Sequence, residues 1–234
     1  MKRIGLLAAG VVLAVLVAFQ VTTQPGADSV RYVAEADTPT VAPGVDVLAG
    51  VPEIPVRTRS YDYRRAAFGE SWDDDNDAPG GRNGCDTRND ILDRDLVEKS
   101  YVSITRCPTA VATGTLIDPY TDATVAFVRG NQIGASVQID HIVPLALAWD
   151  LGARNWSDPM RLRFANDPAN LLAVSGAANQ NKGDGEPAVW MPQNRAFWCQ
   201  YAVQFAAVLR GYGLPVDAPS AQVLREAAGT CPTG

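Results

Sequence analysis

The chain has 234 residues, which is enough for one domain of ordinary size plus an extension. Apolar residues make up 47% and charged residues 20%, a balance that excludes a chain that is disordered throughout. The formal net charge is −6, the wrong sign for a protein held on nucleic acid by overall electrostatic attraction. Any contact with nucleic acid would therefore need a local basic groove or a bound metal ion.

The N-terminus has the pattern of an export signal. Lys2 and Arg3 precede a run of apolar residues and glycines over positions 4–19, and these 16 residues suit a signal peptide better than a membrane span, which usually needs about 20. No small-x-small cleavage site follows Phe19 directly, so an uncleaved signal-anchor is the alternative. We therefore expect residues 1–24 to be a signal peptide or signal-anchor. The protein would then be secreted, or anchored on the extracellular face of the membrane by this N-terminal helix.

Residues 25–55 are predicted to form a flexible linker, because five prolines are scattered among them without a sustained hydrophobic period. The folded domain is expected to occupy residues 56–234. An acidic cluster near its start, at 73–77, invites comparison with a calcium-binding EF-hand loop. Ala78 and Gly84 stand where that loop needs glycine and glutamate, so a solvated acidic loop is the preferred interpretation.

Hydrophobic periodicity predicts a mixture of helices and short strands in this domain. The predicted elements, in chain order, are a helix over 87–99, β-rich pieces over 113–127, a strand over 137–143, a helix over 145–151, a strand over 170–174, and helices over 176–182, 195–209 and 220–228. Thr87 is expected to cap the first helix, and Gly211 and Gly213 are expected to stop the helix that begins at 195.

Four cysteines agree with export: Cys85, Cys107, Cys199 and Cys231. None belongs to a C-x-x-C pair, so a zinc site has little support and two disulfides in an oxidising compartment are the better interpretation. Four cysteines allow three pairings. We favour Cys85–Cys107 and Cys199–Cys231, because each pair brackets a short segment on either side of the candidate site described next.

His141 is the sole histidine of the chain, and it directly follows Asp140. A protein that uses histidine once is expected to place it where proton transfer near neutral pH is needed. Asn170 begins the second predicted strand, and Asn179 and Lys182 lie three residues apart on one face of the helix that follows. Each residue alone has an ordinary structural explanation, as an ion pair, a helix cap or a turn. Their joint spacing favours a single site.

This set suits phosphodiester hydrolysis, which needs a base for the attacking water and charge stabilisation at the phosphoryl group. Asp140 and Asn179 offer oxygen ligands that suit Mg²⁺, and His141 can act as the general base. Lys182 could meet a phosphate, and Asn170 could hold the loop that carries His141. Because neighbours on a strand point to opposite sides, Asp140 and His141 could act together only if the strand ends or bulges there.

Weaker candidates surround this set. Arg88, Arg161 and Arg163 could contact phosphate, or could equally pair with Asp86, Asp90 or Asp167. Asn181 is a further substrate-binding candidate. Trp190 could stack on a base, although core packing is the preferred interpretation.

These residues resemble the motif of a known family. Asp140 to Pro144 followed by Asn170, Asn179 and Lys182 resembles the HNH (ββα-metal, His-Me finger) endonuclease motif. A wider set of motifs resembles the secreted actinobacterial HNH endonuclease family proteins, which share a domain with the C-terminal part of GmrSD-type restriction enzymes. That set is Cys85-Asp86-Thr87-Arg88, Asp118-Pro119-Tyr120-Thr121, Gln138-Ile139-Asp140-His141, Trp149, Gly152-Ala153, Phe164-Ala165-Asn166-Asp167 and the run 179–184.

The resemblance covers roughly residues 61–212. It implies metal ligation by Asp140 and Asn179, a general base at His141 and an orienting role for Asn170. Asparagine stands where many HNH enzymes have a second metal-binding histidine, which favours Mg²⁺ or Mn²⁺ over zinc or nickel.

The sequence thus predicts an α+β fold, with a ββα-metal core embedded in a single disulfide-stabilised domain with flanking helices. The predicted function is a metal-dependent endonuclease that cleaves DNA, with RNA as a second substrate class, at low sequence specificity. A non-catalytic nucleic-acid or envelope binding protein that keeps this fold is the alternative. A serine or cysteine hydrolase has less support, because no G-x-S-x-G elbow is present and the cysteines are better explained as bridges. No obligate protein partner is expected.

Overall fold

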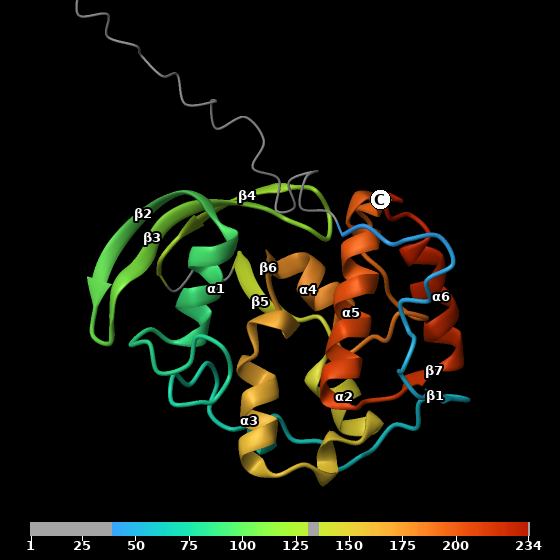
Figure 1. Cartoon of the computed structure of the whole chain (residues 1–234). Helices are drawn as coiled ribbons and strands as arrows, with labels where there is room; N and C mark the ends of the chain where they lie inside the picture. Colours follow the sequence, from blue (N-terminus) through green and yellow to red (C-terminus); the bar gives the residue numbers. More distant parts are fainter. Residues whose placement is uncertain (1–38, 131–135, 234) are drawn as a thin grey trace, which may run out of the picture.

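The computed structural model describes residues 39–130 and 136–233, so the predicted leader and residues 25–38 of the predicted linker lie outside the described part. The fold mixes helices and strands (Figure 1). The strands are β1 (Glu53–Ile54), β2 (Val97–Ile104), β3 (Cys107–Ile117), β4 (Thr124–Val128), β5 (Val137–His141), β6 (Leu171–Ser175) and β7 (Val216–Asp217). The helices are α1 (Thr87–Asp95), α2 (Leu145–Leu151), α3 (Asp158–Asn166), α4 (Gly176–Lys182), α5 (Trp198–Tyr212) and α6 (Ala218–Ala228).

β5 and β6 form a two-stranded antiparallel sheet at the centre of the molecule, and α4 follows β6 directly (Figure 1). The two strands are connected in the chain through α2 and α3, and the pair is called the β5–β6 hairpin below. Its register is regular: Asp140 is opposite Leu172, and His141, the last residue of β5, is opposite Leu171. Residues opposite each other in an antiparallel pair share a face, and successive residues alternate between faces. Asp140 and His141 therefore lie on opposite faces of the hairpin.

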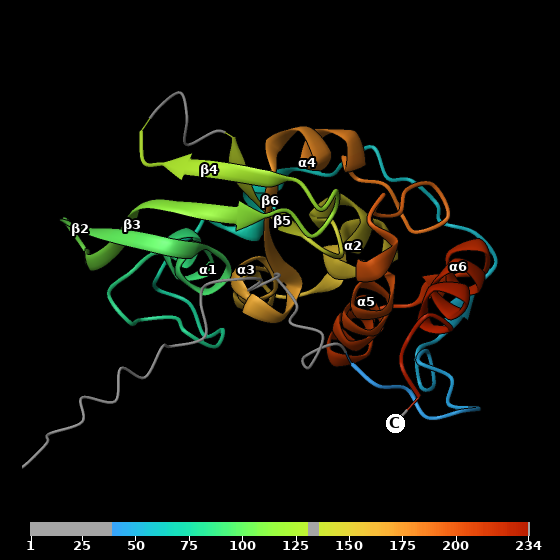
Figure 2. The same cartoon turned by 90° about the horizontal axis from the view of Figure 1, so that it is seen from above.

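The two faces of this hairpin belong to two different hydrophobic cores. Leu172 and Val174 pack in the first core, together with the apolar sides of α2, α5 and α6. Ile139 and Ala173 pack in the second core, against α1 and the sheet of β2, β3 and β4. Figure 2 shows this arrangement from above, with the three-stranded sheet on one side of the hairpin and α5 and α6 on the other. Both faces of β5 are consequently buried.

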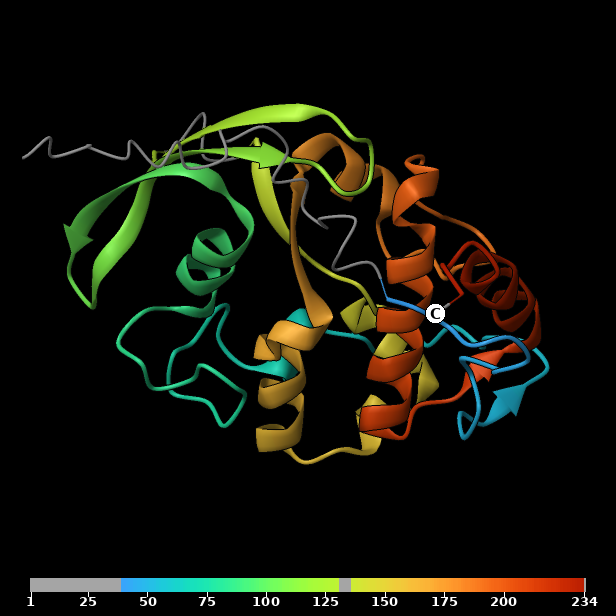
Figure 3. The same ribbon diagram turned by 45° about the horizontal axis from the view of Figure 1, so that its top comes forward.

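The packed domain begins earlier than the sequence indicates. Leu48 and Val51 are buried in the first core, and β1 pairs in parallel with β7 next to α6 (Figure 3). Arg225 of α6 forms ion pairs with Asp46 and Glu53. The part of the expected linker that the structure describes is thus tied to β7 and α6 by strand pairing and ion pairs, and it contributes apolar side chains to the first core.

Several predicted elements agree with the structure, and others differ for identifiable reasons. The helix expected over 87–99 ends at Asp95, because the chain from Val97 pairs with β3 as β2. Its cap is Asp86, whose side chain accepts from the Asn89 amide, rather than Thr87. The helix α3 was not predicted from periodicity. The long helix runs through Gly211 and ends at Gly213, which adopts the left-handed conformation (φ 64°).

The structure contains both favoured disulfides, Cys85–Cys107 and Cys199–Cys231. The first ties the loop before α1 to the start of β3, and the second ties α5 to the C-terminal residues that follow α6. Within the described residues, no helix is both long enough and apolar enough to cross a membrane.

Candidate active site

The Asp140 carboxylate lies on the face of the hairpin that belongs to the first core. Its Oδ2 atom accepts a hydrogen bond of 2.5 Å from the Tyr120 hydroxyl and one of 2.6 Å from Lys182 Nζ. The same ammonium donates to the His141 main-chain carbonyl at 2.6 Å. A buried carboxylate needs such partners, because an unpaired charge in the interior is costly.

Lys182 is therefore an internal counter-ion in this structure. It was expected to reach outward to a phosphate, but its side chain is 0% exposed and that of Asp140 is 7% exposed. Burial lowers the pKa of Lys182, and the negative charge of Asp140 opposes that shift. The lysine reaches Asp140 because α4 lies over the face of β5 that carries the even-numbered side chains.

Asn179 lies one helical turn before Lys182 and contacts the same face of β5. Its amide nitrogen donates to Gln138 Oε1 at 2.8 Å, and Gln138 precedes Asp140 by two residues on the strand. This hydrogen bond uses the side-chain nitrogen of Asn179 and does not involve its Oδ1 atom. Asp140 and Asn179 both belong to this side of the hairpin, and carboxylate and amide oxygens are ligands that suit Mg²⁺ or Mn²⁺.

No group of three or more histidine, cysteine, aspartate or glutamate side chains is arranged to hold a metal within the described residues. A divalent cation at Asp140 would have one charged ligand from the chain and would have to compete with the Lys182 ammonium. Carboxylate and amide oxygens fit such a cation, but the cation can bind only if it displaces the Lys182 ammonium from Asp140 or shares the carboxylate with it.

The His141 ring lies on the opposite face of the hairpin. Its Nε2 atom is 2.9 Å from the carbonyl oxygen of Ala165, at the end of α3. A carbonyl can only accept a hydrogen bond, so Nε2 carries the proton and Nδ1 is the unprotonated nitrogen of the neutral ring. Burial lowers the pKa of His141 to about 3, against the bond to Ala165, which raises it; the positive charges of Arg65 and Lys182 lower it further.

Trp72 stacks on the His141 ring. Their ring centroids are 5.6 Å apart and the ring planes differ by 11°. The Arg65 guanidinium carbon lies 5.8 Å from the centroid of the Trp72 ring. Trp72 has a φ of 62°, a left-handed conformation that costs a bulky residue about 1–3 kcal/mol, so the surrounding structure must hold it there.

Asn170 is fully buried and braces the turn that follows His141. Its Oδ1 atom accepts from the Val143 amide at 2.8 Å, and its Nδ2 atom donates to the Val143 carbonyl at 3.3 Å. Its own carbonyl accepts from the Ile142 amide at 2.8 Å. These are the side-chain to backbone bonds expected of Asn170, and they fix the direction in which the chain leaves β5.

The weaker candidates are mostly engaged with the protein itself. Arg88 donates to the Val137 carbonyl at 3.0 Å, and burial lowers its pKa. Arg163 donates to the Asp77 carbonyl at 3.0 Å, and Arg161 pairs with Asp158. Asn181 accepts from the indole of Trp190, which packs at the edge of the first core. The structure does not gather these residues around Asp140 or His141 through any of these contacts.

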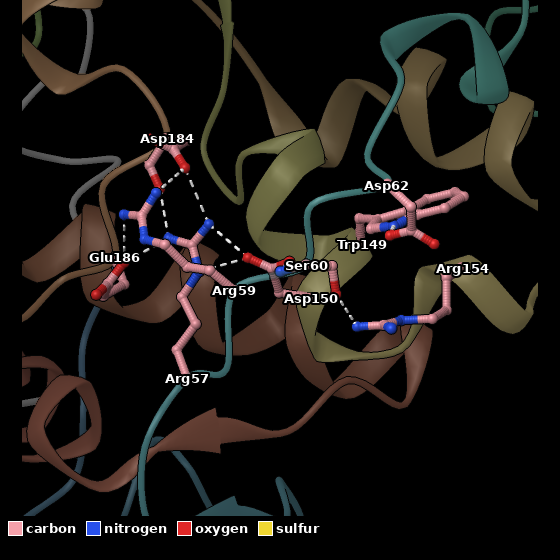
Figure 4. A network of polar contacts seen from close by, with 9 residues as sticks. All are labelled: Arg57, Arg59, Ser60, Asp62, Trp149, Asp150, Arg154, Asp184 and Glu186. Carbon is pink, nitrogen blue, oxygen red and sulfur yellow. Dashed lines mark hydrogen bonds and ion pairs between the residues drawn. The ribbon is translucent and has the colours of Figure 1, made fainter.

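A cluster of charged residues holds the chain where it leaves α4 (Figure 4). Arg57 is 8% exposed and donates to the side chains of Asp150 at 2.7 Å, Glu186 at 2.5 Å and Asp184 at 3.0 Å. It also donates to the main-chain carbonyl of Asp184 at 2.8 Å. Arg57 thereby connects the N-terminal segment to α2 and to the loop just beyond Lys182, and it helps to fix the end of α4.

Sequence reasoning missed several contacts of the site. Tyr120 belonged to a family-like motif, but no spacing rule relates it to Asp140, which lies 20 positions away. Trp72 stands beside the acidic run and gave no signal of contact with His141. Gln138 carried a signal that could have been used, because it lies two residues before Asp140 and so shares its face of the strand.

Comparisons with known proteins agree with this part of the chain. The family model of the C-terminal domain of GmrSD restriction endonucleases matches residues 86–215, which is more than half of the chain. An uncharacterized secreted protein of Arthroderma benhamiae is 35% identical over 149 residues, covering 63% of this chain and 68% of that protein. Its description as secreted is in line with the two disulfides found here. No solved structure matches. The chain therefore belongs to the family of the C-terminal domain of GmrSD restriction endonucleases, a nuclease-related domain.

Proposed function

We propose that this protein is a metal-dependent endonuclease of the HNH type that hydrolyses phosphodiester bonds of DNA, and of RNA as a second substrate class, outside the cell. The observation that carries the proposal is the state of the His141 ring. Its Nε2 proton is committed to the Ala165 carbonyl, so that Nδ1 is left as a base. The family match and the strand–strand–helix order of β5, β6 and α4 support the same conclusion.

In this proposal His141 Nδ1 takes the proton of a water molecule as that water attacks phosphorus and the bond to the 3′ oxygen breaks. With a pKa of about 3, the buried ring is a weak base on its own. A phosphodiester anion next to the ring would raise this pKa, because a neighbouring negative charge favours the imidazolium. Asn170 holds the turn after His141 and so keeps the ring at the end of β5.

Asp140 and Asn179 are the residues that would hold a divalent cation. When bound, the cation would supply charge stabilisation to the phosphoryl oxygens and to the leaving oxygen. Because Asp140 and His141 lie on opposite faces, the phosphodiester must meet them around the end of β5, where the strand stops. Because the net charge is −6, the protein as a whole does not attract nucleic acid, so the substrate must be bound through local contacts. An enzyme that releases its product can work with such weak binding.

The proposal is tested by plasmid nicking with the purified, oxidised full-length protein, in Mg²⁺, Mn²⁺ or EDTA. The full chain is used because a fragment beginning at residue 56 would lack Leu48 and Val51 of the first core. We expect metal-dependent nicking that falls by about 10²–10⁴-fold in His141→Ala, the range typical of a lost general base. Circular dichroism and the melting temperature check that the variant folds.

The alternative, a non-catalytic binding protein, makes a different prediction. It would retard DNA in a gel in both EDTA and Mg²⁺ while leaving the plasmid supercoiled. Folded wild-type protein that cleaves neither DNA nor RNA with either metal would overturn the nuclease proposal. Nicking that His141→Ala retains in full would overturn the role given to His141.

A further inference from the structure

Trp72 contacts the proposed general base but lies outside the part of the chain that the family model matches, which begins at residue 86. The near-parallel stack of Trp72 on His141 covers one face of the imidazole, and the bond from Nε2 to Ala165 fixes its edge. An offset stack and one in-plane hydrogen bond together define both the plane of a ring and its rotation within that plane. His141 itself is only 6% exposed.

The two groups that define the ring are themselves connected. The Trp72 carbonyl accepts from the Thr87 amide at the start of α1, at 3.3 Å. The Thr87 hydroxyl donates at 2.8 Å to the side chain of Asn166, which is next to Ala165 in α3. The guanidinium carbon of Arg65 lies 5.8 Å from the centroid of the Trp72 ring. The indole that stacks on the imidazole and the segment of α3 that binds its edge are thus connected through two hydrogen bonds of Thr87.

The backbone of Trp72 is in the left-handed region, with a φ of 62°, which is unfavourable for a bulky residue. The hollow next to it, lined by residues that include Arg65, Leu145 and Ala165, has a volume of only about 10 Å³. That is about the space of one water-sized probe, so the indole cannot swing into this hollow.

We propose that Trp72 is a positioning residue for His141: its indole face holds the imidazole in the plane that aims Nδ1 at the attacking water. This inference rests on the proposed nuclease function of His141. It assigns a part of the site to the segment before the matched family domain, and it predicts that this segment acts on the rate of catalysis through the ring rather than by contact with the substrate.

The kinetic test compares Trp72→Ala and Trp72→Phe in the full-length oxidised protein. We expect Trp72→Ala to lower kcat by about 10–100-fold, the scale of a misplaced catalytic group, and to leave KM unchanged. Trp72→Phe keeps an aromatic face and should restore most of kcat. The matched control is Trp198→Ala, which removes another half-buried indole with an arginine stacked on it, Arg195 at 4.6 Å, away from His141.

A second readout does not depend on activity. His141 is the only histidine of the chain, so tag-free protein gives a single imidazole Cε1–H signal and a single pair of ring ¹⁵N signals in NMR. In wild type these signals should report the Nε2–H tautomer and the ring current of Trp72. Both should move in Trp72→Ala, and neither should move in Trp198→Ala.

The outcomes separate this proposal from its rivals. An unchanged imidazole signal in Trp72→Ala would overturn it, and so would an unchanged kcat. A higher rate in Trp72→Ala would overturn it as well, by showing that the indole is a cover. A change confined to KM would show instead that Trp72 contacts the substrate. If wild-type protein had no nuclease activity, the function proposed for His141 would fail, and the NMR signals alone would decide whether Trp72 orders the ring.

Discussion

On one face of the β5–β6 hairpin a buried carboxylate is bonded to an ammonium and a phenol, and on the other a neutral imidazole lies between an indole and a carbonyl. The first arrangement compensates the charge of Asp140, which cannot be buried without partners. The second arrangement orients a neutral ring, because it offers one hydrogen-bond acceptor at the ring's edge and a flat neighbour against its face. We therefore expect mutations of Lys182 and Tyr120 to act first on stability, and mutations of His141 and Trp72 to act first on catalysis.

Removal of Lys182 is the change expected to have the largest effect on stability. Lys182→Ala leaves Asp140 buried without its counter-ion, and breaking a buried pair in this way costs about 3–5 kcal/mol of the free energy of unfolding. The measurement is urea unfolding in EDTA. The matched control is Lys99→Ala, which breaks the Lys99–Asp93 pair at the surface and should cost at most about 1 kcal/mol. Equal losses in the two variants would contradict the assignment.

The same variant tests whether the ammonium competes with a cation. Lys182→Ala removes the group that neutralises Asp140, so Mg²⁺ should raise its melting temperature more than it raises that of wild type. Asp140→Asn in the same background should abolish that extra gain. A variant that gains no more from Mg²⁺ than wild type does would show that Asp140 and Asn179 do not hold the cation.

Two buried tyrosines of the first core provide a finer comparison on the same face. Tyr120 donates to Asp140, whereas the hydroxyl of Tyr201 has no hydrogen-bond partner among the described residues. Tyr120→Phe should therefore cost about 1.5–3 kcal/mol, the value of a hydrogen bond to a charged group. Tyr201→Phe should cost nothing or stabilise the protein, because it removes an unsatisfied polar atom. Similar urea midpoints for the two variants would contradict the bond to Asp140.

Local sequence patterns predicted much of the fold because the residues concerned are close in the chain. The helix expected over 176–182 coincides with α4, and the strand expected over 137–143 contains β5. The alternation rule also placed Asp140 and His141 on opposite faces. The chain from Val97 was misassigned, because its pairing with β3 outweighs its helical pattern. Leu48 and Val51 could not be placed, because the core they join is built largely from elements about 100 or more positions away.

The site was predicted less completely than the fold. Spacing proposed Asp140, His141, Asn170 and Asn179 as one candidate site, and the hydrogen bonds of Asn170 are of the kind expected. It could not show that Lys182 turns inward, because that depends on how α4 lies on β5. It also could not bring Trp72 to His141, since that contact depends on a left-handed residue in a loop without periodicity.

The smallest effect is expected at Asp90, in α1 on the His141 side of the hairpin. Burial raises its pKa to about 6, with a contribution from the negative charges of Asp74, Asp86 and Asp93, against a hydrogen bond from Asn83 that lowers it. The folded protein therefore binds this proton more tightly than the unfolded chain does. Stability should fall as the pH rises from about 4 to about 6, and the loss should persist above that window.

Asp90→Asn removes this ionisation, so the melting temperature at pH 7 should rise slightly and its decline between about pH 4 and pH 6 should become flatter. Asp93 is the matched control with the opposite sign. Burial raises the pKa of Asp93, but the hydrogen bonds from Lys99 and Tyr101 and the charge of Lys99 together outweigh burial, so the pKa is lowered overall. Asp93→Asn should thus lose stability at pH 7, with the loss vanishing at low pH. If both variants moved the melting temperature in the same direction at pH 7, burial of Asp90 would not be the cause of its raised pKa.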